Sequence, residues 1–113
     1  MKLFPITPAQ ASFLEIEIVG RYLDDEDTEE ARVAANIAEH LERSRGTAMA
    51  VGEFHRDALA RMLLELINDM DDEIERAKKG DSDALGRLGG IDTVKQARGL
   101  WASGFALWKK VRT

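Results

Sequence analysis

Cysteine is absent from this 113-residue chain, which contains only two histidines. Without cysteine the chain can form no disulfide, no thiolate metal site and no cysteine nucleophile. His40 and His55 have no partner at metal-ligand spacing and no serine–acid pair beside them, so we expect neither a zinc site nor a catalytic triad. The stretch "GRLGG" lacks the lysine and the Ser/Thr of a phosphate-binding loop. We therefore expect no cofactor and no catalytic residues.

Long apolar runs are also missing. No stretch approaches the ~20 residues that a membrane-spanning helix needs, and the opening Met1–Pro5 is too short for a signal peptide. We therefore expect a cytoplasmic protein without a membrane partner. At 113 residues, 44% of them apolar, the chain fits a single domain over residues 1–113.

Charge is distributed unevenly along the chain. Residues 1–75 hold seven Lys/Arg against 18 Asp/Glu, a net charge of −11, whereas residues 76–113 hold nine against three, a net charge of +6. Such asymmetry fits a nucleic-acid patch, a protein-binding surface or two halves that fold against each other. We expect the basic segment to contact protein, either the acidic segments 24–30 and 69–75 or an acidic partner.

The hydrophobic pattern predicts an all-α fold, a bundle of four principal helices and one short helix. The stretch "SFLEIEIVGRYL" (12–23) alternates like a strand, but Thr7, Pro8 and Gln10 supply an N-cap, a first-turn proline and a capping-box residue. We therefore predict a helix here. On a helical wheel the apolar side chains fill most of the circle and leave one narrow polar strip: Gln10, Glu17, Arg21 and Asp24.

Three more long helices and the short one follow. The second helix is predicted to start at an Asp27 N-cap and to end at about Arg45. After a short link, "GTAMAVG", the long central helix covers about residues 52–79. A short helix near 83–88 and a "GGID" turn precede a last helix that starts at about Thr93.

The long central helix has apolar side chains on two sides. A lone chain of this size would struggle to cover both sides, and large exposed apolar patches are uncommon on monomers. We therefore predict a symmetric homodimer with Leu64 and Ile67, which belong to the second stripe, at or near its seam. The first stripe is expected to be buried; it comprises Phe54, Ala58, Leu59, Met62, Leu66, Met70, Ile74 and Ala77.

A metal site is one alternative. Glu39 and Glu42 have E-x-x-E spacing on one predicted helix, and Glu65 and Asp69 lie near each other on the next. Carboxylates from two facing helices can hold Mg²⁺. The arrangement resembles the all-α nucleotide pyrophosphohydrolases, whose pattern is E-x-x-E followed by E-x-x-D, although Asn68 stands at the position of the final acid. This resemblance implies Mg²⁺-dependent nucleotide hydrolysis, whereas i,i+4 ion pairing implies only a solvated surface.

DNA binding is a second alternative. Residues 84–101, "ALGRLGGIDTVKQARGLW", resemble a helix-turn-helix whose second helix presents Lys95, Gln96 and Arg98. Those residue types suit base edges and phosphates. The spacing from the turn to Val94 is one residue short of the usual pattern, and the acidic remainder of the chain would repel a duplex.

The last predicted helix carries Trp101, Phe105 and Trp108 at helical spacing, which is typical of a core. If part of this row is exposed, aromatic anchors beside Lys109 and Lys110 would form a protein-binding hot spot. We therefore favour a non-enzymatic regulator, inhibitor or adaptor that occupies the surface of a partner protein. The candidate partner-binding residues are Leu64, Ile67, Trp101, Trp108, Lys109 and Lys110.

Overall fold

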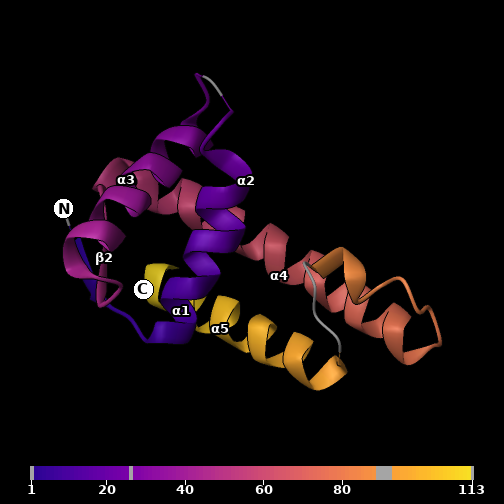
Figure 1. The fold of residues 1–113 in the computed structure, drawn as a ribbon. Coiled ribbons are helices and arrows are strands. Elements are labelled where there is room, and N and C mark those ends of the chain that lie inside the picture. Colours follow the sequence, from indigo (N-terminus) through magenta and orange to yellow (C-terminus); the bar gives the residue numbers. More distant parts are fainter. Residues whose placement is uncertain (1, 26, 89–92, 113) are drawn as a thin grey trace.

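Two long antiparallel helices, α4 (Arg56–Lys78) and α5 (Val94–Arg112), pack against each other along the protein (Figure 1). The fold was obtained as a computed structural model that describes residues 2–25, 27–88 and 93–112. The elements that precede α4 in the chain gather around one end of the pair. In chain order the elements are β1 (Lys2–Pro5), α1 (Pro8–Phe13), a π-helix (Leu14–Val19), α2 (Gly20–Tyr22), α3 (Glu29–Ser44), β2 (Ala48–Val51), a 3₁₀-helix (Glu53–His55), α4 (Arg56–Lys78), a 3₁₀-helix (Gly86–Leu88) and α5 (Val94–Arg112).

The predicted all-α bundle is confirmed as a mostly helical fold, with a two-stranded sheet that the helical pattern did not reveal. The "GTAMAVG" segment, predicted as a link, contains strand β2, which pairs with β1 in an antiparallel sheet. The register places Lys2 opposite Val51 and Pro5 opposite Ala48. No described helix is sufficiently long and apolar to cross a bilayer.

The first helix is continuous from Pro8 to Tyr22 and starts as predicted. The Thr7 hydroxyl accepts the backbone N–H of Gln10 at 3.2 Å, and the Gln10 side chain accepts the backbone N–H of Thr7 at 3.0 Å. These two reciprocal bonds satisfy backbone donors that the first turn would otherwise leave unpaired. From Leu14 the helix widens into a π-helix over six residues.

The predicted starts of the next two helices need correction. Thr28, not Asp27, caps α3, because its hydroxyl accepts the backbone N–H of Ala31 at 3.1 Å. The central helix begins at Arg56, after a 3₁₀ turn rather than at residue 52. Phe54 belongs to this turn and is 93% exposed, so its predicted place in the buried stripe is wrong.

The main core lies where the first helix and α3 meet the α4–α5 pair. Phe13 reaches into the junction of the two long helices, where its ring lies against Gly104 and Ile67. Glycine at position 104 permits this close approach because it has no Cβ. The largest fully buried side chains are those of Phe13, Leu14, Ile18, Val33, Ile37, Met49, Leu59, Leu63, Met70, Leu107 and Val111.

The last turn of α5 is hydrogen-bonded to residues near the start of the chain. The ammonium group of Lys110 donates to the carbonyl of Pro5 at 2.8 Å and to Oε1 of Gln10 at 2.9 Å. The Arg56 guanidinium donates to the carbonyl of Val111 at 2.9 Å and 3.3 Å. Lys110, predicted as a partner-binding residue, therefore connects α5 to β1 and α1 within one chain.

Candidate protein-binding surface

The four carboxylates of the metal alternative do not form a cluster. Glu39 and Glu42 lie exposed on α3, and Glu65 and Asp69 lie exposed on α4. Glu39 forms an ion pair with Arg43 on its own helix. Within residues 2–25, 27–88 and 93–112, no three His, Cys, Asp or Glu side chains come together as a metal site would require. The geometry that the pyrophosphohydrolase resemblance implied is therefore not present in the described chain.

The carboxylates on α4 instead face the end of the first helix. Burial raises the pKa of the Tyr22 hydroxyl above its usual value, and the negative charges of Glu65, Glu30 and Asp69 raise it further. The nearby Arg21 guanidinium acts in the opposite direction. Tyr22 is thus held in its neutral form beside an acidic surface made by α3 and α4.

The helix-turn-helix alternative lacks its first α-helix. Residues 82–85 form turns and Gly86–Leu88 form a single 3₁₀ turn, so the short helix predicted near 83–88 is corrected. The predicted "GGID" turn lies outside the described residues. A helix-turn-helix needs two packed α-helices to place the second in the major groove, and the described part of this segment provides only the second.

The three candidate DNA-contacting side chains lie in the first turns of α5. Gln96 is part of a capping box: its side chain accepts the backbone N–H of Thr93 at 3.3 Å, while the Thr93 hydroxyl accepts the backbone N–H of Gln96 at 3.1 Å. Lys95 and Arg98 are exposed. The structure thus gives Gln96 a role in starting the helix.

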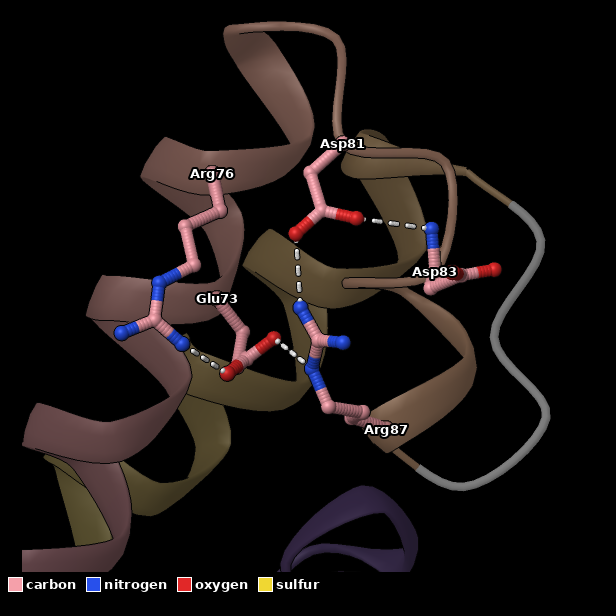
Figure 2. Close-up of polar contacts among 5 residues, drawn as sticks. All are labelled: Glu73, Arg76, Asp81, Asp83 and Arg87. Atoms are coloured by element: carbon pink, nitrogen blue, oxygen red, sulfur yellow. Dashed lines mark hydrogen bonds and ion pairs between the residues drawn. The ribbon is translucent and has the colours of Figure 1, made fainter.

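An ion-pair network folds the segment after α4 back onto that helix (Figure 2). Nε of Arg87 lies 2.7 Å from Glu73, and its Nη2 lies 2.7 Å from Asp81. Glu73 also accepts from Arg76 at 2.7 Å, and Asp81 accepts the backbone N–H of Asp83 at 3.0 Å. Part of the basic segment therefore pairs with the acidic end of α4 within one chain.

The network changes the acidity of its members. Hydrogen bonds to Glu73 and Asp81 raise the pKa of the Arg87 guanidinium. The hydrogen bond from Arg87 lowers the pKa of the Asp81 carboxyl, and the backbone N–H of Asp83 lowers it further. A depressed folded-state pKa means that the contribution of Asp81 to stability is present above the pKa of an unfolded aspartate and is lost as pH falls.

Arg87→Gln is expected to raise the pKa of the Asp81 carboxyl toward its usual value, because the main donor to that carboxylate is removed. The measurement is an NMR pH titration that follows the side-chain carboxyl carbon of Asp81. Arg76→Gln is the control, since the Arg76 side chain pairs with Glu73 and the Arg76 backbone carbonyl, which accepts the backbone N–H of Asp81, is retained. An unchanged Asp81 titration in Arg87→Gln would show that the network does not persist in solution.

A partly exposed aromatic row runs along α5. The rings of Trp101 and Phe105 stack with centroids 5.0 Å apart, and those of Phe105 and Trp108 are 5.7 Å apart. The ammonium of Lys109 lies 5.6 Å from the Phe105 centroid, and the Arg112 guanidinium lies 4.7 Å from that of Trp108. All three aromatic residues are half-buried, so the row belongs to both the packed interior and the surface.

Two hollows mark the ends of the groove between α4 and α5. The first, of about 320 Å³, is lined by Asp71, Ile74, Lys78, Arg98, Trp101 and Ala102. The second, of about 390 Å³, is lined by Glu53, Arg56, Asp57, Ala60, Val111 and Arg112. At the first hollow the end of α4 adjoins the start of α5, and at the second hollow the start of α4 adjoins the end of α5. The two helices are therefore antiparallel.

Leu64 falls between the two hollows. It follows Ala60 by four residues and precedes Asp71 by seven, spacings that place all three on one side of α4. At ~1.5 Å per residue, Leu64 lies ~6 Å from the level of Ala60 and therefore near the level of Trp108. Its side chain is 38% exposed. The surface formed by Leu64, Trp101, Phe105 and Trp108 is called the α4–α5 strip below.

The opposite side of the groove is covered by the first helix. Ile67 is only 3% exposed and packs beside Gly104, where the Phe13 ring lies. Ile67 is three residues from Leu64, which turns it away from Leu64 by about 60° around α4. Helical spacing thus places Leu64 on the side of α4 that adjoins the two hollows, while the aromatic row and Lys109 lie on α5. In contrast, Ile67 is buried, and Lys110 donates to Pro5 and Gln10 within the chain. Phe105 is the one residue of the strip that was not predicted as a partner-binding residue, although its helical spacing from Trp101 placed it in the same row.

The two edges of the strip differ in charge. The α5 edge carries Arg98, Lys109 and Arg112, and α5 contains no acidic residue. The α4 edge carries Asp57 and Asp71 as well as two cations, Arg56 and Lys78. Arg56 donates to the Val111 carbonyl and Lys78 pairs with Glu75. The surface is therefore apolar along its centre, basic on one edge and mixed in charge on the other, where its carboxylates lie.

No family model, curated protein or solved structure matches this chain. The function must therefore be inferred from the geometry and chemistry of the α4–α5 strip and its charged edges.

Proposed function

We propose that this protein is a non-enzymatic, cytoplasmic regulator, inhibitor or adaptor that binds another protein chain through the α4–α5 strip. One observation carries the proposal: Leu64 of α4 and the stacked row of Trp101, Phe105 and Trp108 on α5 are large apolar side chains that all remain partly exposed. Tryptophan and other aromatic residues are enriched at the energetic centres of protein interfaces. The cytoplasmic location is supported by the lack of cysteine.

The charged edges support protein recognition further. Cations at the edge of an interface accelerate association and select complementary partners more than they add affinity. Here Lys109 and Arg112 lie over the rings of the strip itself, so they also shield aromatic surface from water in the free protein. A partner that brings acidic side chains to this edge would pair with these cations while covering the rings.

Leu64→Lys is expected to abolish protein binding through the strip, because it places a charge at the centre of the apolar surface. The measurement is affinity capture from cells that produce the protein, combined with sedimentation velocity for self-association. Leu23→Lys provides a matched control, since Leu23 is 43% exposed and Leu64 is 38% exposed. Circular dichroism and thermal melting should show that both variants remain folded.

The proposal requires that complexes formed by the wild type survive Leu23→Lys and disappear with Leu64→Lys. If a folded Leu64→Lys variant keeps every complex of the wild type, another surface carries the binding.

A further inference from the structure

We infer that the strip receives a second copy of this chain, docked so that α4 of one protomer lies over α5 of the other. This inference rests on the proposed protein-binding role of the strip and specifies the partner. In a symmetric dimer that buries the strip, the same surface is used by both copies, so strip meets strip. The question is then which helix of one copy faces which helix of the other.

Two arrangements keep the long helices of the two copies aligned. When the two-fold axis runs along the helices, α4 faces α5 of the partner, and the reverse. When the axis runs across them, α4 faces α4 and α5 faces α5. The second arrangement sets the cations of the α5 edge, Arg98, Lys109 and Arg112, against the same cations of the second copy. It also sets the α4 edge, which carries Asp57 and Asp71, against itself.

Charge complementarity therefore selects the first arrangement, since like charges placed opposite one another in an interface are strongly unfavourable. Asp71 and Arg98 line one hollow, and Asp57 and Arg112 line the other. With the axis along the helices, each level of the groove faces the same level of the partner. Asp71 then faces Arg98 of the partner subunit, and Asp57 faces Arg112 of the partner subunit.

The two carboxylates are available for such pairing. In the described part of the chain, neither Asp57 nor Asp71 forms an ion pair or a side-chain hydrogen bond. Arg61, the one basic residue near the middle of α4, points away from the groove toward Glu29 of α3, at 4.0 Å. The acidic edge of the strip is thus left without an internal cation at its centre.

The resulting assembly is a four-helix bundle built from two helical pairs. Every helix has antiparallel neighbours, as in up-and-down bundles, and the centre is filled by Leu64 and the three aromatic residues from both copies. The first helix and α3 remain outside, because Phe13 occupies the other side of the groove. Dimerisation would therefore complete a core around α4 and α5 without altering the fold of either chain.

Asp71→Arg tests the arrangement. It replaces two symmetry-related attractive pairs by repulsive ones, and we expect the dimer affinity to fall by about tenfold or more. An equimolar mixture of Asp71→Arg with Arg98→Asp should associate again, because each cation then meets a carboxylate in the other chain. Asp69→Arg is the matched control: it makes the same charge change on α4, but Asp69 lies on the side that faces Arg21. Analytical ultracentrifugation measures the wild type, Asp71→Arg, the mixture and Asp69→Arg.

Cross-linking tests the orientation directly, because the natural chain has no cysteine. A protein carrying Asp71→Cys is mixed with one carrying Arg98→Cys and treated with a short bismaleimide. We expect the 71-to-98 product between chains, whereas a mixture of Asp71→Cys with Asp57→Cys should give no product between chains. A dominant 71-to-57 product, or an Asp71→Arg variant that associates as strongly as Asp69→Arg, overturns the inference.

A wild type that stays monomeric up to about 100 μM, a concentration at which even weak specific dimers assemble, also overturns it. That result leaves the proposed function separately testable. Capture of a different protein that is lost in Leu64→Lys would show that the strip binds a partner other than itself.

Discussion

Gly104→Ala is expected to lower the melting temperature of the protein, whereas Gly99→Ala in the same helix is expected to raise it. A Cβ at position 104 would lie 2.7 Å from Cζ of Phe13 and 2.9 Å from Cγ2 of Ile67. Overfilling a packed interior in this way costs about 1–3 kcal/mol. At position 99 a Cβ would meet nothing within 4 Å, so only the better helix propensity of alanine remains, worth about 0.5–1 kcal/mol.

The helix-propensity gain applies to both variants, so their difference isolates the contact between the first helix and the α4–α5 pair. For a domain of this size, each 1 kcal/mol shifts the melting temperature by roughly 4–8 °C. Thermal unfolding followed by circular dichroism measures both variants. Phe13→Leu introduced into Gly104→Ala should recover part of the loss, because a smaller side chain gives the new methyl group room. Equal melting temperatures for the two alanine variants would mean that Phe13 does not occupy this position in solution.

Arg21→Ala is expected to destabilise the protein far more than Arg43→Ala, although each removes the arginine of a Glu–Arg pair at i,i+4. The Glu17 side chain is 4% exposed, and its Oε2 lies 2.9 Å from Nε of Arg21. That oxygen has no hydrogen-bond partner among the described residues, so the ion pair with Arg21 is its compensation. Removing Arg21 leaves a buried carboxylate uncompensated, which costs about 1–3 kcal/mol.

Glu39 and Arg43 form the control pair. Their side chains are 53% and 68% exposed, and an exposed helical pair of this kind contributes about 0.3–0.5 kcal/mol. Urea unfolding gives the free energies of both variants. Glu17→Gln should restore part of the stability lost in Arg21→Ala, since a neutral amide is less costly to bury than a carboxylate. If the two arginine variants lose equal stability, Glu17 is accessible to water in solution.

Local signals in the sequence predicted the helices, because the start and the stability of a helix depend on residues that are close in the chain. Thr7, Pro8 and Gln10 indicated a helix where the alternation of "LEIEI" suggested a strand, and the helix is confirmed. Strand β2 gave no such signal. Its partner β1 lies more than forty residues earlier in the chain. A segment of only four residues, "AMAV", does not show a strand pattern by itself.

The candidate site could be predicted only in part, for a different physical reason. Periodicity placed Leu64 and Ile67 in one apolar stripe, but it could not show that Phe13 covers Ile67 and leaves Leu64 exposed. Likewise, Lys110 reads as a solvated cation in a basic run, yet its ammonium reaches residues near the start of the chain. Both outcomes depend on contacts between distant segments, which a helical wheel does not contain.

The hydrogen bonds that connect the last helix to the first elements of the chain have a consequence during synthesis. Lys110 binds Pro5 and Gln10 across 105 and 100 residues. At a translation rate of roughly 5–20 residues per second, the first helix must wait roughly 5–20 s for these partners to be made. Throughout that interval Phe13 and its apolar neighbours lack the helix that buries them, so they are accessible to chaperones. A ribosome that stalls before residue 104 would release a product with this surface uncovered, which quality-control proteases would recognise.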